Sequence, residues 1–203
     1  MKNSSSENPG PAVRNVLALL VLISAVAQAQ TCNPNTARTA SEQRYSAVSD
    51  GAEVKDRVTE LIWQRCSVGQ RWNGKTCLGR ASAYGWAKAQ EVANTSVTSL
   101  SGASVPPKLA SDSAAVSRDA DFSLAFTWRL PTHKELHSLI EQACRDPAIN
   151  TVWFPATRAS FYWSASTFSD DANFAWGVDF SDGRGSYDAK DGAYSVRLVR
   201  AAP

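Results

Sequence analysis

The four cysteines of this 203-residue chain constrain its fold more than any other feature of the sequence. An even number of cysteines in an exported chain predicts two disulfides, and four cysteines allow three pairings. Cys66 and Cys77 flank SVGQRWNGKT, whose Asn-Gly turn can bring its two ends together. We therefore expect Cys66 to pair with Cys77, and Cys32 to pair with Cys144. Zinc binding is the alternative, but it would favour short spacings such as Cys-x-x-Cys, which the sequence lacks.

The beginning of the chain has the three-part layout of a secretory signal peptide. A polar start with Lys2 and Arg14 precedes an apolar run at 16–26 and a small-residue end, Ala27-Gln28-Ala29. The alternative is a membrane anchor, but the 11 residues of this run are too few to cross a hydrocarbon core of about 30 Å. We therefore expect cleavage after residue 29 and export to the periplasm or beyond the cell, with no membrane-embedded segment in the mature protein.

The charge of the chain argues against several classes of partner. The sequence has 21 Lys and Arg residues and 19 Asp and Glu residues, and removal of Lys2, Arg14 and Glu7 with the leader leaves the mature part almost neutral. Nucleic acids and anionic membranes attract proteins with a strong positive balance. Net charge therefore gives no case for either partner.

The mature part is long enough for one domain with a sizeable core. We expect an N-terminal extension at 30–52 and a domain at 53–203. Residues 94–123 are rich in Ser, Ala, Thr and Asp and contain a Pro-Pro pair, so they are interpreted as a surface insertion. Hydrophobic spacing predicts helices at 82–93, capped by Ser82, and from Thr132 onward. Aromatic and alternating segments predict strands at 58–64, 161–166, 174–180 and 194–199.

The stretch WRLPTHKELHSLI at 128–140 raises the question of a metal site. Thr132 and Glu135 have the spacing of a capping box, in which each side chain satisfies a free backbone donor of the other residue. His133 and His137 are four residues apart, but the metalloprotease pattern has a glutamate directly after the first histidine, where this chain has lysine. The stretch therefore predicts a structural helix, whose apolar face consists of Leu136, Leu139, Ile140 and Ala143.

Four aspartates near the C-terminus suggest calcium as the one cofactor to consider. Asp179, Asp182, Asp188 and Asp191 are interleaved with glycines, but their spacing does not match an EF-hand loop. Asp and Gly are also the ordinary residues of turns. We therefore assign no metal ligands and no cofactor.

Several of these motifs together resemble one bacterial family. DRVTELIWQRC at 56–66, WRLPTHKEL at 128–136, AINTVWFP at 148–155, YWSAS at 162–166 and VRLVR at 196–200 are similar to the Lcl C-terminal domain family. This resemblance implies an α+β fold related to formylglycine-generating enzymes and C-type lectins, with two helices on a twisted antiparallel sheet. It also implies a scaffold role for Trp63, Trp128, Arg129, Leu130, Pro131, Thr132, Glu135, Trp163 and Arg197.

The resemblance and the residues together favour binding over catalysis. Formylglycine-generating enzymes use two cysteines in their C-terminal part, and this chain has none after Cys144. The sequence also has no Gly-x-Ser-x-Gly elbow, and its two histidines share one helix, so we assign no catalytic residues. The adhesin that names the family binds sulfated glycosaminoglycans through a trimeric end domain, which implies a glycan or cell-surface ligand. This chain departs from it in having no collagen-like repeat.

We therefore expect an exported, non-enzymatic binding module stapled by two disulfides. The alternative is a structural or assembly component that packs against another envelope or pilus protein. Loops on a rigid scaffold commonly carry binding residues. The expected surface consists of the loops 169–173 and 182–190, with the candidate ligand-binding residues Asp170, Asp171, Asn173, Asp182, Arg184 and Tyr187.

Overall fold

The computed structural model describes residues 29–95, 97–98 and 126–203. The predicted signal peptide and most of the predicted insertion at 94–123 lie outside these described residues. The described part is mainly β-structure, with short strands, two α-helices and a 3-10 turn, η1 (Glu42–Arg44). None of the described helices is long and apolar enough to cross a membrane.

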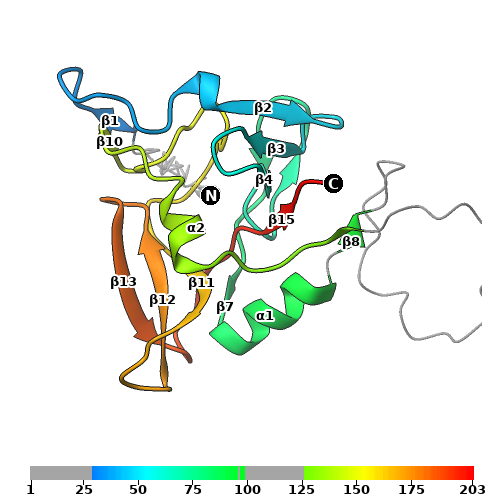
Figure 1. Cartoon of the computed structure of the whole chain (residues 1–203), viewed down its shortest axis with the longest axis vertical. Helices are drawn as coiled ribbons and strands as arrows, with labels where there is room; N and C mark the ends of the chain where they lie inside the picture. Colours follow the sequence, from blue (N-terminus) through cyan, green and yellow to red (C-terminus); the bar gives the residue numbers. More distant parts are fainter. Residues whose placement is uncertain (1–28, 96, 99–125) are drawn as a thin grey trace, which may run out of the picture.

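Two sheets form most of the domain (Figure 1). The larger sheet has five strands in the order β13 (Arg184–Ala189), β12 (Phe174–Asp179), β11 (Phe161–Thr167), β14 (Tyr194–Ser195) and β7 (Ala83–Tyr84). Its β11 and β14 strands run parallel, while its other neighbours are antiparallel. The second sheet is antiparallel and has the order β15 (Val199–Ala201), β4 (Leu61–Gln64), β3 (Glu53–Asp56) and β2 (Tyr45–Val48).

Three two-stranded ladders complete the described β-structure. They pair β1 (Thr31–Cys32) with β10 (Cys144–Arg145), β5 (Arg71–Trp72) with β6 (Cys77–Leu78), and β8 (Val97–Thr98) with β9 (Phe126–Thr127). The first ladder attaches the N-terminal segment to the chain that follows the second helix. The second ladder is a hairpin.

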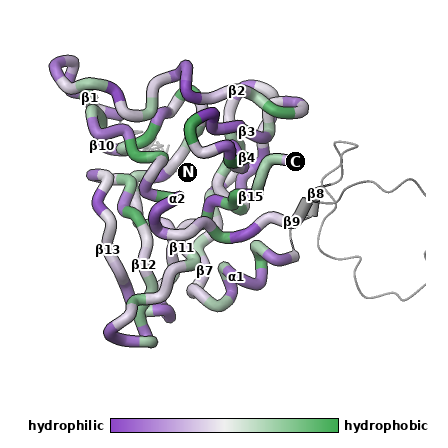
Figure 2. The backbone as a smooth tube through the Cα atoms, in the orientation of Figure 1, coloured by the Kyte–Doolittle hydropathy of each residue, from purple (hydrophilic) through white to green (hydrophobic). Residues whose placement is uncertain are grey.

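The central strands bury side chains on both of their faces. Because successive strand residues point to opposite sides, Ile62 and Trp63 of β4 belong to two different core clusters. Tyr162 and Trp163 of β11 divide between the same two clusters. Figure 2 colours the backbone by hydropathy and shows hydrophobic segments in both sheets, among them β4 and β12. Because the central strands are buried on both faces, other elements of the domain must pack against both of those faces.

Each helix covers one of the two clusters. Helix α1 (Trp86–Thr95) buries Ala89 and Ala93 in one cluster, and α2 (His133–His137) buries Leu136 in the other. The predicted capping box at the start of α2 is confirmed, since Thr132 accepts from the Glu135 backbone and the Glu135 side chain accepts from the Thr132 backbone. Such a cap satisfies two backbone donors that the first turn leaves free.

Both disulfides have the predicted pairing. Cys32 and Cys144 face each other in the β1–β10 ladder and join positions 112 residues apart in the sequence. Cys66 and Cys77 join positions 11 residues apart, across the β5–β6 hairpin. The first bond therefore closes most of the chain, whereas the second closes a single loop.

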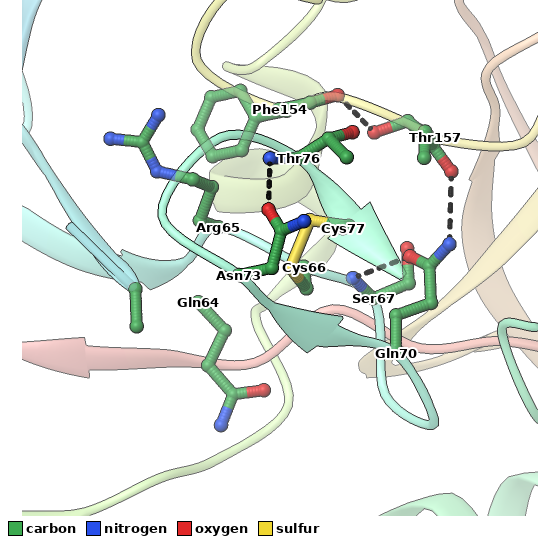
Figure 3. Close-up of a disulfide and its surroundings, with 12 residues drawn as sticks. Gln64, Arg65, Cys66, Ser67, Gln70, Asn73, Thr76, Cys77, Phe154 and Thr157 are labelled. Carbon is green, nitrogen blue, oxygen red and sulfur yellow. Dashed lines mark hydrogen bonds between the residues drawn. A yellow bond between two sulfur atoms is a disulfide. The ribbon is translucent and has the colours of Figure 1, made fainter. Parts of the chain in front are cut away.

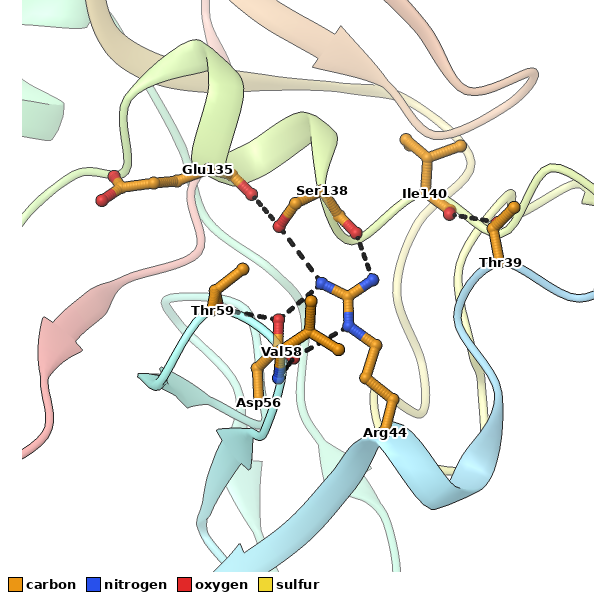
Figure 4. A network of polar contacts seen from close by, with 8 residues as sticks. All are labelled: Thr39, Arg44, Asp56, Val58, Thr59, Glu135, Ser138 and Ile140. Carbon is orange, nitrogen blue, oxygen red and sulfur yellow. Dashed lines mark hydrogen bonds and ion pairs between the residues drawn. The ribbon is translucent and has the colours of Figure 1, made fainter.

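A buried ion pair connects the second sheet to α2 (Figure 4). Arg44 donates from Nε and Nη2 to the two carboxylate oxygens of Asp56, at 2.8 and 2.5 Å, and from Nη1 to the carbonyl of Ser138 at 2.8 Å. Asp56 also accepts from the Val58 backbone and the Thr59 hydroxyl. Burial alone would raise the pKa of Asp56, but the hydrogen bonds from Arg44 and its other donors hold that pKa below its ordinary value.

Arg197 from the closing VRLVR motif is fully buried. Its guanidinium donates to the carbonyls of Gln64 and Arg65 and to the hydroxyls of Ser67 and Thr157. No carboxylate pairs with Arg197 among the described residues. Burial lowers the pKa of Arg197 to about 10. Neutral acceptors and the ring of Phe154, 4.9 Å from the guanidinium, surround the cation.

The predicted fold class is wrong in its architecture. The expectation was an α+β, C-type-lectin-like domain with two helices on one twisted antiparallel sheet. The described residues instead form two main sheets, one of them mixed, and their α-helices have only 10 and 5 residues. Short aromatic and β-branched segments dominate the chain, and these favour strands over helices.

Several element boundaries also differ from the prediction. The first helix begins at Trp86 and not at 82, because residues 83–84 pair with β14 as strand β7. Helix α2 ends at His137, so Leu139, Ile140 and Ala143 are buried beyond the helix and not on its face. The expected strand at 194–199 is divided, since its first two residues join the larger sheet and its last residue joins the second. The expected strand at 58–64 begins only at Leu61, and Val58 is 72% exposed in a turn.

Candidate functional site

Four aromatic side chains gather on the side of the β12–β13 hairpin that α2 packs against. Trp176 and Tyr187 are directly opposite each other in the two strands, and their ring centroids are 5.4 Å apart. Phe168 lies nearly parallel to Tyr187 at 4.1 Å, and Phe174 meets Tyr187 edge-on at 5.9 Å. None of the four is fully buried, and Tyr187 is 45% exposed. We call Phe168, Phe174, Trp176 and Tyr187 the aromatic face.

Phe174, Trp176 and Val178 point to one side of β12, and Ala175 and Gly177 point to the other. Val178 and Ala175 are buried in the two different core clusters, so both sides of the strand contribute to the core, whereas Phe174 and Trp176 are only half-buried. Gly177 lies against β11 so closely that a side chain there would collide with the Phe161 ring and the backbone of Tyr162. The aromatic face is therefore the part of the Val178 side of β12 that the core leaves partly exposed.

His133 of α2 extends the aromatic face by one more ring. Its imidazole stacks on Trp176 with centroids 4.9 Å apart and an interplanar angle of 27°, and it lies directly over Gly185 of β13. Burial lowers the pKa of His133, and the neighbouring His137 lowers it further. The imidazole is therefore neutral at pH 7, and it forms part of a continuous row of rings.

This strand-rich domain matches a known family over most of its length. The model of the Lcl C-terminal domain family matches residues 52–200. The chain belongs to the Lcl C-terminal domain family. A search of curated proteins found no match.

The WRLPT motif of this Lcl C-terminal domain supports the site without lining it. Trp128 and Leu130 are buried in the core, and Pro131 is buried beside them. Arg129 makes a two-pronged ion pair with Glu135, at 2.8 and 2.7 Å, at the beginning of α2. That hydrogen-bonded pair raises the pKa of Arg129 and holds α2, and with it His133, against the sheet.

Other residues with an expected scaffold role are also in the interior. Trp63 and Trp163 are fully buried, and Trp163 donates from its indole nitrogen to the carbonyl of Tyr84. Arg197 occupies the buried position described above. These side chains contact core and backbone groups, so they support the packing of the Lcl C-terminal domain's sheets.

The structure separates five of the six candidate ligand-binding residues into two groups. Asp170, Asp171 and Asn173 lie in the loop between β11 and β12, where Asp171 accepts from the Asn173 backbone at 2.8 Å. Asp182 and Arg184 lie at the turn between β12 and β13 and pair with each other at 3.2 Å. These turns are at opposite ends of six-residue strands, about 17 Å apart at 3.4 Å per residue. The two groups therefore do not form one site.

Tyr187 is the candidate that lies within the aromatic face. The sequence reasoning missed Phe168, Phe174, Trp176 and His133 as surface residues. The signal was the alternation in FAWGV, which places Phe174 and Trp176 on the same side of a strand. That side also carries the buried Val178, so the alternation groups the two rings but does not show that they are partly exposed.

The aspartates considered for calcium serve separate local structures. Asp179 and Asp182 each accept from a backbone amide two residues onward. Asp188 accepts from the Tyr194 hydroxyl at 2.6 Å, and this hydrogen bond raises the pKa of Tyr194 to about 12. Within the described residues, no group of three or more His, Cys, Asp or Glu side chains has the arrangement of a metal site.

Proposed function

We propose that this Lcl C-terminal domain is an exported, non-enzymatic binding module that holds a carbohydrate against its aromatic face. The observation that carries the proposal is the half-exposed cluster of Trp176, Tyr187 and Phe168 on rigid strands. Aromatic rings in a domain with a large aromatic core would ordinarily be buried. Rings left at the surface in contact with one another are typical of recognition sites.

Sugar rings match such a surface chemically. A pyranose presents C–H bonds with a partial positive charge on one side, and the face of an aromatic ring is negative. Its hydroxyl groups then need polar partners at the edge of the rings. Asp170, Asp171 and Asn173 lie in the loop that joins Phe168 to Phe174, so carboxylate and amide groups border the aromatic face.

The site needs little rearrangement to bind. Lys190 holds the bordering loop by donating from Nζ to the carbonyl of Ala172 at 2.6 Å, and its backbone donates to the carbonyl of Asn173. A preorganised loop reduces the entropy that binding would otherwise cost. Rigid strands and a held loop therefore support recognition of a defined ligand.

The test is an array of immobilised oligosaccharides probed with the wild-type protein and with Tyr187→Ala. We expect binding to a restricted set of glycans, and at least a tenfold loss of affinity in Tyr187→Ala, because truncating a central aromatic contact commonly costs 2 kcal/mol or more. Val152→Ala is the matched control, since Val152 is 60% exposed and lies outside the aromatic face. Arg184→Ala tests the far turn and should retain binding.

A second candidate function is a structural or assembly role. Strand β13 is at the end of the larger sheet and pairs only with β12 in the described part of the chain, so its outer backbone edge can accept another strand. A blank array together with a partner protein that co-purifies through this edge would replace the carbohydrate proposal. Glycan binding that survives Tyr187→Ala would remove the aromatic face from the proposal.

A further inference from the structure

The near-neutral total charge of the chain conceals a local excess of positive charge. Residues 66–80, which comprise the loop closed by the Cys66–Cys77 disulfide and the three residues after it, contain Arg71, Lys75 and Arg80 and no Asp or Glu. We call this segment the basic hairpin. It includes the β5–β6 ladder, and its tip is the turn at Asn73 and Gly74.

The register of the hairpin gives it an inner and an outer side. Trp72 is opposite Cys77, and Arg71 is opposite Leu78. Residues directly opposite in an antiparallel pair point to the same side. Cys77 is buried and Trp72 is half-buried, so that side faces the domain, while Arg71 and Leu78 face solvent together.

The inner side is fixed firmly to the domain. The Arg65 guanidinium lies over the ring of Trp72 at 4.5 Å and over the ring of Trp153 at 5.0 Å. Asn73 accepts from the backbone amides of Lys75 and Thr76, which closes the tip, and Figure 3 shows the second of these bonds beside the disulfide. The basic hairpin is therefore a rigid projection.

A fourth positive charge lies beside the hairpin. Gln70 donates from its side chain to the carbonyl of Gly79 at the end of the hairpin and to the carbonyl of Ala156. The second bond brings the loop that carries Arg158 next to the hairpin base. Arg158 is exposed, as are Arg71, Lys75 and Arg80.

No salt bridge neutralises these four cations within the described part of the chain. Salt bridges in the described residues involve Arg44, Lys55, Lys88, Arg129, Arg184 and Arg200, and none involves a cation of the basic hairpin or Arg158. Leu78 is 45% exposed among them. A group of free cations around an exposed leucine combines the two features of a protein surface that adsorbs to charged bilayers.

We propose that the basic hairpin docks on the surface of an anionic phospholipid bilayer. Arg71, Lys75, Arg80 and Arg158 contact lipid phosphates, and Leu78 enters the boundary between headgroups and acyl chains. Leu78 favours a bilayer over an anionic polysaccharide, because a polysaccharide offers charge but no apolar layer for a leucine to enter. This surface is built on different strands from the aromatic face, so the proposal does not depend on carbohydrate binding.

The experiment is co-sedimentation of the mature, disulfide-intact protein with phospholipid vesicles. One set of vesicles contains only phosphatidylcholine, and the other contains equal parts of phosphatidylcholine and phosphatidylglycerol. We expect binding to the anionic vesicles alone, with a strong decrease as salt is added. Replacement of one cation, as in Lys75→Gln, should weaken partitioning roughly fivefold, and Arg71→Gln, Lys75→Gln and Arg80→Gln together should weaken it roughly hundredfold.

Two further variants separate the proposal from general charge effects. Arg145→Gln removes the same charge from an exposed residue of β10 outside the hairpin, and it should leave partitioning unchanged. Leu78→Ser should weaken vesicle binding severalfold without any change in charge. Leu78 and the three hairpin cations are all exposed, so unchanged thermal unfolding should show that the variants fold.

Two results would overturn the proposal. One is equal partitioning of wild type and the triple variant on anionic vesicles. The other is binding to immobilised heparin that needs the three cations but not Leu78, without vesicle binding, which would assign the surface to polyanionic polysaccharides.

Discussion

The two disulfides should contribute very differently to stability, and the difference follows from the loops that they close. A cross-link stabilises mainly by restricting the unfolded chain, and the effect increases with the length of the closed loop. The Cys32–Cys144 bond spans 112 positions and the Cys66–Cys77 bond spans 11. The chain-entropy relation then gives about 4.8 and 2.8 kcal/mol at 25 °C.

The perturbation is paired replacement with serine. Cys32→Ser with Cys144→Ser should lower the free energy of unfolding by about 2 kcal/mol more than Cys66→Ser with Cys77→Ser. A single domain commonly has only 5–15 kcal/mol of stability, so losing the long-range bond removes a large share of it. Urea unfolding followed by tryptophan fluorescence measures both free energies, with the slopes fitted separately for each variant.

The larger effect of the Cys32–Cys144 bond requires that the N-terminal segment unfolds together with the domain. Non-covalent contacts support this, because Asn33 donates to the carbonyl of Ala143 and the Glu141 carboxylate accepts from the backbones of Thr39 and Ala40. If the Cys32 and Cys144 replacements lowered the free energy of unfolding less than the Cys66 and Cys77 replacements did, this explanation would be refuted. The segment at 30–40 would then detach alone, and its disulfide would not contribute to global stability.

Three further substitutions probe the interior. Asp56→Asn should lower the free energy of unfolding by about 3 kcal/mol in urea titrations, because it leaves Arg44 buried without an anion. The pKa of Asp56 in the folded protein is below its ordinary value. The stability that the ionised carboxylate contributes is therefore fully present above the ordinary pKa and is lost as the pH falls through the folded pKa. Acidification should therefore lower the urea midpoint of wild type more than that of Asp56→Asn. Gly177→Ala should sharply lower the thermal midpoint, since the new methyl group would meet the Tyr162 backbone. Arg197→Lys should cost at least about 2 kcal/mol in the same urea titration, because a lysine amine cannot reach all of the acceptors of the guanidinium.

Local patterns in the sequence predicted local structure well. The capping box depends on two residues three positions apart, Thr132 and Glu135, and it is present. The Cys66–Cys77 pair depends on a turn between the two cysteines, and it is also present. In both cases the interacting groups are close in the chain, so few alternative partners compete with the predicted one.

The arrangement of the sheets depends on contacts that no local pattern specifies. Leu139 and Ile140 continue the helical spacing of Leu136, but the helix ends before them and they join the core from an irregular segment. The stretch from Tyr194 to Val199 alternates like one strand, yet its ends pair with partners in two different sheets. Apolar spacing shows that a residue is buried, and it does not show which partner covers it.

The candidate surfaces were hidden from sequence reasoning for a related reason. The alternation at 174–180 predicts a strand, but both of its faces contribute buried residues, Ala175 on one and Val178 on the other, so only the folded chain shows that Phe174 and Trp176 stay partly exposed. The basic hairpin was missed because net charge is a sum over the whole chain. A net charge near zero is compatible with one segment whose charged side chains are all positive. The Cys66–Cys77 disulfide holds the basic hairpin in place.

The two proposed surfaces can be tested against each other in one set of variants. The aromatic face is on β12 and β13, whereas the basic hairpin is on β5 and β6, so neither group of side chains contributes to the other. Tyr187→Ala should therefore weaken glycan binding at least tenfold and retain vesicle binding, and the triple hairpin variant should weaken vesicle binding roughly hundredfold and retain glycan binding. Soluble protein, anionic vesicles and an array of the glycans bound by wild type are sufficient for the measurement. Loss of both activities in either variant would mean that one extended surface binds a single charged ligand, because two independent sites cannot fail together in a folded protein.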